Sequence, residues 1–222
     1  MSSGTVTRAG TVVQEDEVVR YSFPERVVHW INAAAYTYLL GSGLALFTPY
    51  LWWLAPVMGG GGTLRFLHPW VGLLYMVTIL WMQSEWSRDM RAIPQDEAWT
   101  KNLKAYVENR DEVMPPQERF NAGQKQFWWV MLWCSVILLI TGVIMWFPEK
   151  IPFSLHWVLT ITVFVHSAVA LITIGAFIIH VYMSGWMTPG SMKAMIEGKV
   201  STRWARSHHR LWYERITGRG RN

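Results

Sequence analysis

An almost uninterrupted apolar segment spans residues 157–187 and contains two histidines, His166 and His180. A segment of this length and composition predicts a transmembrane helix, in which an imidazole is costly unless it has a partner. The two histidines are fourteen residues apart. On an α-helix this spacing corresponds to about 21 Å of rise and returns the side chains to within about 40° of one face. It excludes a single mononuclear metal site and predicts two stacked cofactors, each taking one imidazole from this helix.

Three further apolar segments predict a bundle of four transmembrane helices. They cover residues 28–47, 67–82 and 127–147. The chain is 51% hydrophobic and contains 15 tryptophans, a composition typical of an integral membrane protein with aromatic residues at the membrane interfaces. We therefore expect an all-α membrane protein, with a polar arm over residues 1–24, a transmembrane domain over 25–188 and a basic tail over 189–222.

The segments between the apolar stretches predict little further structure. Residues 59–62 are four glycines that indicate a flexible connection, and residues 84–125 predict a polar loop or short surface helices. The single cysteine, Cys134, lies in an apolar segment, which excludes a disulfide framework, a cysteine-bound iron–sulfur cluster and covalent haem attachment. The polar, acidic start of the chain does not match a cleavable signal peptide, so we expect the first apolar helix to be an uncleaved anchor.

The distribution of lysine and arginine predicts the orientation of the four helices. Eighteen of the twenty basic residues lie in residues 1–26, in residues 84–125 or in the tail, and only Arg65 and Lys150 lie in the other two loops. Since basic residues favour the cytoplasmic side, both termini are expected in the cytoplasm, in a bacterial inner membrane. The net charge of +5 then reflects the membrane topology and contacts with lipid headgroups. Four membrane spans argue against the alternative that the basic tail binds nucleic acid.

The histidines can be sorted by their expected depth in this arrangement. His68 and His166 fall in the outer half, whereas His29 and His180 fall in the inner half. Each pair offers two imidazoles from two helices, as a bis-histidine b-type haem requires. We therefore predict an outer haem bound by His68 and His166 and an inner haem bound by His29 and His180. The remaining histidines are expected on the surface, namely His156, His208 and His209.

Simpler explanations remain open for these residues. A histidine near a helix end, such as His29 or His68, is more often an interfacial or hydrogen-bonded residue than a ligand. Small residues at the same depths would let a flat macrocycle approach the backbone, but they are equally typical of close helix packing. These small residues are Gly41, Ser42, Gly43, Gly72, Ala170 and Gly175.

Four motifs resemble the cytochrome b gamma subunit of membrane-bound respiratory formate dehydrogenase. They are Arg-Val-Val-His-Trp ending at Trp30, Leu-His-Pro-Trp-Val-Gly from Leu67, Phe-Asn-Ala-Gly-Gln-Lys from Phe120 and Met-Ile-Glu-Gly-Lys-Val-Ser from Met195. The resemblance covers about residues 20–215, and the last two motifs are its most specific parts. The amino-terminal arm is longer and more acidic than the family pattern, and its role is open.

The resemblance implies a larger complex and a quinone site. In that family the gamma subunit holds two b haems and receives electrons from an iron–sulfur beta subunit on the outer side, while a molybdenum or tungsten alpha subunit oxidises formate. The resemblance also implies that menaquinone or ubiquinone is reduced at the inner face, at Asn121, Gly123, Gln124 and His180. Taken alone, Asn121 and Gln124 would instead indicate the N-cap and first turn of a helix.

The leading hypothesis is a four-helix di-haem cytochrome b that carries electrons to quinone and does not itself oxidise formate. One alternative of the same class is the cytochrome b subunit of another periplasmic oxidoreductase, such as a nickel–iron hydrogenase or a thiosulfate reductase. An alternative of another class is a haem-free membrane anchor, whose histidines would be satisfied by side chains and water. A pyridine haemochrome spectrum separates the two classes.

The predicted topology can be tested with reporter fusions. A reporter after Asn222 is expected to be active only as a cytoplasmic reporter, and one inserted near Gly61 only as a periplasmic reporter, because the basic residues divide eighteen to two. The opposite pattern would reverse the topology and exchange the inner and outer haem positions, without changing which histidines pair.

Overall fold

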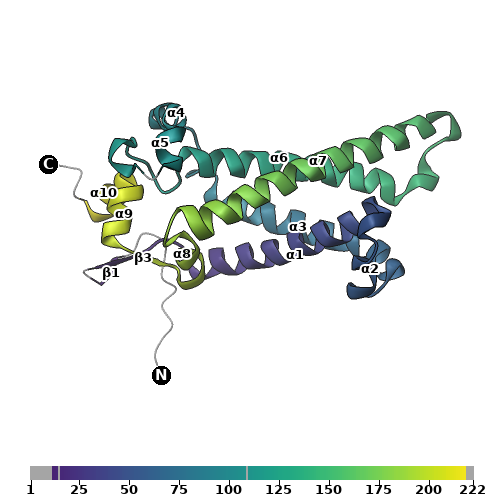
Figure 1. Cartoon of the computed structure of the whole chain (residues 1–222), viewed down its shortest axis with the longest axis horizontal. Helices are drawn as coiled ribbons and strands as arrows, with labels where there is room; N and C mark the ends of the chain where they lie inside the picture. The colour runs from purple at the N-terminus through teal and green to yellow at the C-terminus, as the bar shows by residue number, and fades with distance from the viewer. Residues whose placement is uncertain (1–11, 15, 109, 219–222) are drawn as a thin grey trace, which may run out of the picture. The chain divides into compact units, whose positions relative to one another are not determined.

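The structure is a computed structural model that describes residues 12–14, 16–108 and 110–218 of the chain, and Figure 1 shows its helices and short strands. The chain forms two compact units. The first unit comprises Met1–Val27, Ser84–Trp128 and Ile179–Asn222, and the second comprises Val28–Gln83 and Trp129–Ile178. Four long helices each contribute residues to both units.

Each predicted apolar segment forms one of these long helices. They are α1 (Phe23–Phe47), α3 (Gly61–Trp86), α6 (Ala122–Trp146) and α7 (His156–Tyr182), and a π-helical turn, η5 (Met183–Met187), follows α7. Among the described residues, three stretches are long and apolar enough to cross a membrane, namely Gly61–Trp86, Ala122–Trp146 and Phe153–Met187. Helix α1 has 25 residues but is not among these three stretches.

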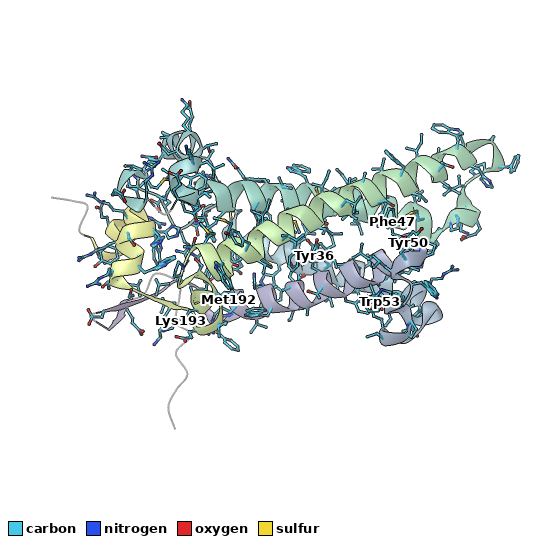
Figure 2. All side chains as sticks on the ribbon, viewed as in Figure 1. Tyr36, Phe47, Tyr50, Trp53, Met192 and Lys193 are labelled. Carbon is cyan, nitrogen blue, oxygen red and sulfur yellow. The ribbon has the colours of Figure 1, made fainter. Side chains whose placement is uncertain are left out.

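Side-chain contacts connect the four helices of the second unit in a closed ring. The contacts are Ser42 with His68 between α1 and α3 (2.7 Å), Tyr75 with Ser135 between α3 and α6 (3.1 Å), Thr141 with His166 between α6 and α7 (2.8 Å) and Tyr36 with Thr173 between α1 and α7 (3.1 Å). Tyr36, labelled in Figure 2, also packs its ring against Phe177 of α7. Polar contacts of this kind join helices where lipid removes the hydrophobic driving force. The second unit is therefore a four-helix bundle.

Helices α1 and α3 run antiparallel in this bundle. Asn32, in the first half of α1, donates a hydrogen bond of 2.8 Å to Thr78 in the second half of α3. Ser42, in the second half of α1, contacts His68 in the first half of α3. Residue numbers thus rise in one helix as they fall in the other, so Ser42 and His68 lie at one end of the bundle and Asn32 and Thr78 lie toward the other.

Short helical turns make the connections between the long helices of the second unit. They are η1 (Pro49–Leu51) and α2 (Leu54–Val57) between α1 and α3, and η3 (Pro148–Lys150) and η4 (Phe153–Leu155) between α6 and α7. Tyr50 and Trp53, labelled in Figure 2, are 90% and 62% exposed, as aromatic residues at a membrane interface are. The glycine run predicted as flexible forms a defined turn, in which Gly59 and Gly60 have φ values of +93° and +92° that favour glycine.

The first unit contains short helices that follow the polar segments of the chain. They are α4 (Pro94–Lys101), α5 (Leu103–Val107), α8 (Ser191–Glu197), α9 (Thr202–His208) and α10 (Arg210–Thr217), together with the 3-10 turn η2 (Asp111–Val113). The first two confirm the short surface helices predicted for residues 84–125. The tail is folded rather than merely basic, because its helices bury residues such as Trp212 and Ala205.

A three-stranded antiparallel sheet departs from the predicted all-α class. Its strands are β1 (Val12–Gln14), β2 (Glu17–Val19) and β3 (Lys199–Ser201), in the order β1-β2-β3. In the pairing of β2 with β3, Val18 lies opposite Val200, and both side chains are buried. The sheet joins the amino-terminal arm to the tail. No local pattern predicts this pairing, because its partners are far apart in the sequence.

A buried ion pair connects the start of α1 to the loop that precedes α6. Glu25 Oε1 accepts hydrogen bonds from Arg119 and from the indole N–H of Trp86, each 2.7 Å long. Arg119 also donates to Asp89 at 3.0 Å, and it exchanges hydrogen bonds to backbone carbonyl oxygens with Arg20. The side chains of Glu25 and Arg119 are each only 7% exposed, so salt and water screen their attraction little.

The tail packs on the same loop through a histidine that was expected on the surface. His209 is 2% exposed, and its Nδ1 lies 2.6 Å from the carbonyl oxygen of Glu118. Burial, followed by the positive charge of Arg20, lowers the pKa of His209 well below its ordinary value. The ring is therefore neutral and donates its Nδ1–H to the carbonyl. The surface prediction is wrong for His209, because only the folded tail brings it to this loop, whereas His156 is exposed as predicted.

Replacing Arg119 by Met is expected to destabilise the protein by about 3 kcal/mol, because it leaves the buried Glu25 carboxylate without its cation. Lys101 and Glu97, whose side chains are 72% and 76% exposed at a separation of 2.6 Å, provide the matched control. Lys101→Met should change the stability by less than about 1 kcal/mol. Thermal unfolding of the purified protein measures both effects, and equal effects would show that the Glu25 pair acts only as a surface ion pair does.

Candidate functional site

Two of the predicted ligands, His68 of α3 and His166 of α7, face each other within the second unit. Their ring centres are 6.5 Å apart, and the ring planes are inclined by 57°. Both residues belong to the bundle described above, at the end where Ser42 contacts His68. The structure thus brings together the two histidines that sequence depth alone had paired for the outer haem.

In each of these histidines, the Nδ1 atom contacts a hydroxyl group from a neighbouring helix. His68 Nδ1 lies 2.7 Å from Ser42 Oγ of α1, and His166 Nδ1 lies 2.8 Å from Thr141 Oγ1 of α6. Such contacts orient the rings and leave Nε2 as the nitrogen that can bind a metal.

The spacing of the two rings fits a haem iron between them. If each Nε2 lies about 2 Å from a shared iron and each ring centre lies about 1 Å behind its nitrogen, the two centres are about 6 Å apart. The observed separation of 6.5 Å agrees with this arrangement. Two imidazoles are too few for a zinc site held by protein alone, and the described residues contain no group of three or more potential metal ligands. The donor set suits a metal whose remaining ligands come from a macrocycle.

A glycine follows each hydroxyl residue and lies beside the same ring. A Cβ atom at Gly43 would be 3.5 Å from Cε1 of His68, and a Cβ atom at Gly142 would be 3.5 Å from Cε1 of His166. A side chain longer than a methyl group would therefore crowd each ring next to its Nε2 atom. Thr141 and Gly142 are not among the small residues that were expected from the sequence to admit a macrocycle. The signal that could have found them is a hydroxyl residue followed by glycine, which α1 and α6 both contain.

The other two predicted ligands lie in different units, and their pairing stays a prediction. His29 belongs to the part of α1 in the second unit, where its ring meets Trp30 edge-on at 5.3 Å and 87°. His180 belongs to the part of α7 in the first unit. Its ring stacks on Phe127 of α6, with the centres 4.4 Å apart and the planes inclined by 7°. This stack restrains the orientation of the His180 ring.

Asn121 and Gln124 form a capping box at the start of α6. Oδ1 of Asn121 accepts a hydrogen bond of 2.9 Å from the backbone N–H of Gln124, and Oε1 of Gln124 accepts one of 3.0 Å from the backbone N–H of Asn121. The N-cap interpretation is therefore confirmed. Because both contacts use the side-chain oxygens, each amide presents its NH2 group to any further partner. Asn121 and Gln124 can therefore cap the helix with their side-chain oxygens and donate hydrogen bonds from their NH2 groups to the carbonyl groups of a ligand at the same time.

Helix α4 accounts for the glycine at position 123. A Cβ atom at Gly123 would be 2.8 Å from Cη2 of Trp99, a residue of α4 that is 3% exposed. Asp96 of the same helix pairs with Lys125 of α6 at 2.9 Å. Gly123 therefore lets α4 pack closely on the first turn of α6. No local pattern in the polar segment predicts these contacts, which depend on how α4 folds against α6.

Comparison with protein families places the bundle in a known group. Residues 20–198 match the family described as prokaryotic cytochrome b561. The matched region includes the whole second unit and all four predicted haem ligands. It also includes the capping box at the start of α6.

Individual proteins similar to this chain align with it over most of their own length. The cytochrome b556(Fdn) subunit of the nitrate-inducible formate dehydrogenase of Escherichia coli strain K12 is 34% identical over 199 residues, which is 90% of this chain and 91% of the relative. The cytochrome b556(fdo) subunit of the same organism is 34% identical over 203 residues, covering 91% and 95%. The formate dehydrogenase cytochrome b556 subunit of Haemophilus influenzae is 29% identical over 205 residues, covering 91% and 84%.

Replacing either His68 or His166 by Ala is expected to remove one and the same b-haem component, because the two rings face each other at a separation that fits a single haem iron. Pyridine haemochrome spectra and redox titration of the purified complex measure this loss. His156→Ala, at an exposed position of α7, should retain all the haem, and His29→Ala should spare the component that His68 binds. Loss of different components from the His68 and His166 variants would contradict the pairing.

Proposed function

The chain belongs to the prokaryotic cytochrome b561 family, and on this premise we propose that it is the membrane di-haem cytochrome b subunit of a formate dehydrogenase. In this role it passes electrons from an outer b haem to an inner b haem and then to quinone. The observation that carries the proposal is the opposition of His68 and His166 at 6.5 Å, in a chain 34% identical to formate dehydrogenase cytochrome b556 subunits.

His68 and His166 hold the outer haem through their Nε2 atoms. A haem with two imidazole ligands has no open iron position and carries single electrons. The chain's own residues orient the ligands through Ser42 and Thr141 and leave space beside them at the adjacent glycines. The bundle helices that carry the two histidines are rich in apolar residues, and the hydrophobic shell around a metal site controls its solvent access and its reduction potential.

His29 and His180 are the proposed ligands of the inner haem, on the ground of helix periodicity. Within the second unit, Tyr36 of α1 contacts Thr173 of α7 at 3.1 Å. His29 precedes Tyr36 by seven residues, and His180 follows Thr173 by seven residues. Seven residues are about two helical turns and return a side chain to within about 20° of its starting face. This equal spacing supports the second pair that depth in the sequence predicts.

Four membrane spans are part of the proposal, in which α1 is the fourth span beside the three stretches that are long and apolar enough to cross a membrane. Residues 28–47 contain no Asp, Glu, Lys or Arg. Helix α1 also completes the ring of contacts in the bundle through Ser42 and Tyr36. The uneven distribution of basic residues then orients both termini toward the cytoplasm of a bacterial inner membrane.

The proposed partners are an iron–sulfur beta subunit and, through it, a molybdenum or tungsten alpha subunit that oxidises formate. Cys134 is the single cysteine of this chain and lies within α6, so the clusters that deliver electrons belong to another subunit. The relatives are named as formate dehydrogenase subunits, which favours formate over hydrogen or thiosulfate as the source of electrons.

Quinone is reduced, in this proposal, at the start of α6 on the cytoplasmic side. The NH2 groups of Asn121 and Gln124 donate hydrogen bonds to the ring carbonyls, because their oxygens are already used by the capping box. Gln124 and Phe127 are one turn apart on the same face of α6, and Phe127 stacks on His180, a proposed inner-haem ligand. Gly123 contributes to the quinone site indirectly, because it leaves space for the ring of Trp99 from α4.

The proposed direction of transfer makes the reaction electrogenic. Reduction of the quinone takes two electrons, which arrive from the outer side, and two protons, which come from cytoplasmic water. The amide donors stabilise negative charge that develops on the quinone oxygens before the protons arrive. Menaquinone and ubiquinone both present the two ring carbonyls that this arrangement needs.

Two variants of the capping box separate a role in quinone binding from a role in capping alone. Asn121→Ser retains an N-cap oxygen but removes the NH2 donor, and Gln124→Ala removes the second donor. Both are expected to slow quinone reduction by the intact complex at least about tenfold, the effect of losing roughly 1.4 kcal/mol of transition-state stabilisation, while formate or dithionite still reduces both haems.

The control for these variants is Gln126→Ala, an exposed neighbour in the first turns of α6 whose side chain contacts Thr100. It should leave the steady-state rate of quinone reduction unchanged. Wild-type turnover in both Asn121→Ser and Gln124→Ala would remove the capping box from the quinone site, and slow reduction of the haems themselves would place the defect before the quinone.

A further inference from the structure

The hydroxyl groups that contact the two outer histidines have matching surroundings on two different helices. Ser42 Oγ lies 2.7 Å from the carbonyl oxygen of Tyr38 and 3.3 Å from that of Leu39. Its third close partner is His68 Nδ1, at 2.7 Å. A hydroxyl carries one proton, so it can donate to only one of these partners at a time.

Thr141 repeats this arrangement on α6. Its Oγ1 lies 2.7 Å from the carbonyl oxygen of Ile137 and 3.3 Å from that of Leu138. His166 Nδ1 completes the set at 2.8 Å. Helices α1 and α6 therefore each present a hydroxyl that faces two backbone acceptors and one imidazole nitrogen.

The carbonyl oxygens decide which group carries the proton between hydroxyl and imidazole. A carbonyl oxygen cannot donate, so a contact of 2.7 Å with it is favourable only if the hydroxyl proton points toward it. Serine and threonine in apolar helices commonly donate in this way to the preceding turn. The hydroxyl oxygen must then accept from the imidazole, which requires a proton on Nδ1 of His68 and of His166. Each Nε2 is left with its lone pair.

We propose that Ser42 and Thr141 are positioning residues that hold His68 and His166 in the Nε2-ligating tautomer and set the reduction potential of the haem between them. The proposal rests on the proposed function, because it assumes that this bundle binds haem. The geometry of the four side chains carries it, through two contacts of 2.7 and 2.8 Å that join a hydroxyl oxygen to an imidazole Nδ1 atom on each side.

The expected effect on the potential has a definite sign. A hydrogen bond from Nδ1–H to an acceptor makes the imidazole a more basic ligand, and a more basic ligand favours the oxidised, more positively charged iron. Ser42 is fully buried and Thr141 is 8% exposed, so bulk water does not reach these positions as a substitute acceptor. Removal of either hydroxyl should therefore make the potential of the outer haem more positive.

A purely structural explanation treats both residues as ordinary helix-packing hydroxyls. Ser135 of α6 provides the matched control for it. Its Oγ also bonds the carbonyl oxygen four residues earlier, that of Met131, at 2.6 Å, and it also contacts a side chain of another helix, Tyr75. It is buried to a similar degree, at 3% exposure, but its partner is not a histidine. Ser135→Ala therefore removes the same packing and the same pair of contacts without touching a proposed ligand.

The experiment is a redox titration of the haems in the intact purified complex, with pyridine haemochrome to count them. Ser42→Ala and Thr141→Val remove the hydroxyls, whereas Ser42→Thr and Thr141→Ser retain them. Each removal should shift the reduction equilibrium of one haem about fivefold toward the reduced form, which is about 40 mV at 59 mV per tenfold for one electron. The hydroxyl-retaining variants and Ser135→Ala should keep the wild-type potential, and the second haem should not shift.

Every outcome of this titration bears on the proposal. Loss of the outer haem from Ser42→Ala or Thr141→Val, with haem retained in the conservative variants and in Ser135→Ala, would support it, since ligation then needs the hydroxyl acceptor. Unchanged potentials in both hydroxyl-free variants would overturn it. Equal shifts or equal haem loss in Ser135→Ala would overturn it in favour of packing. A wild-type complex without b haem would instead refute the proposed function, whatever the variants do.

Discussion

The second unit depends on one constraint, which is that an imidazole inside an apolar helix bundle needs partners for both of its nitrogens. In His68 and His166 a hydroxyl group meets this need at Nδ1, and the two ring centres lie 6.5 Å apart, a separation that fits a shared haem iron at the Nε2 atoms. The contacts that satisfy the two rings are also contacts between α1 and α3 and between α6 and α7. The chemistry of the candidate site and the cohesion of the bundle therefore share the same atoms.

The first unit is organised by a different interaction, the buried pair of Glu25 and Arg119. The charges of Glu25 and Arg119 stabilise each other strongly because neither side chain is well solvated. The pair, with Trp86 and Asp89, ties the first turn of α1 to the loop that leads into α6. The capping box follows that loop directly, so the amide groups proposed to bind quinone start from an anchored backbone. The folded tail adds to this anchor through the neutral, buried His209.

In the proposed function, each of the two units has a different role. The second unit brings His68 and His166 together within a helix bundle, which suits the proposed transfer of electrons through a haem that has no open iron position. The first unit supplies the amide groups of the capping box and several charged pairs, which suit the proposed reduction and protonation of quinone. Within the first unit, Phe127 of α6 stacks on His180. This contact links a proposed haem ligand to the helix whose first turn is proposed to bind quinone.

The sequence by itself determined the long helices, the fourteen-residue histidine spacing and the Asn121 cap, since these follow from local composition and the helical period. Only the tertiary structure decided that Ser42 and Thr141 contact the proposed ligands, that Trp99 fills the space at Gly123, that β2 pairs with β3 and that His209 is buried. The physical reason is that periodicity specifies which residues share a face of one helix or strand. Which faces meet, and at what rotation, depends on packing between segments far apart in the chain.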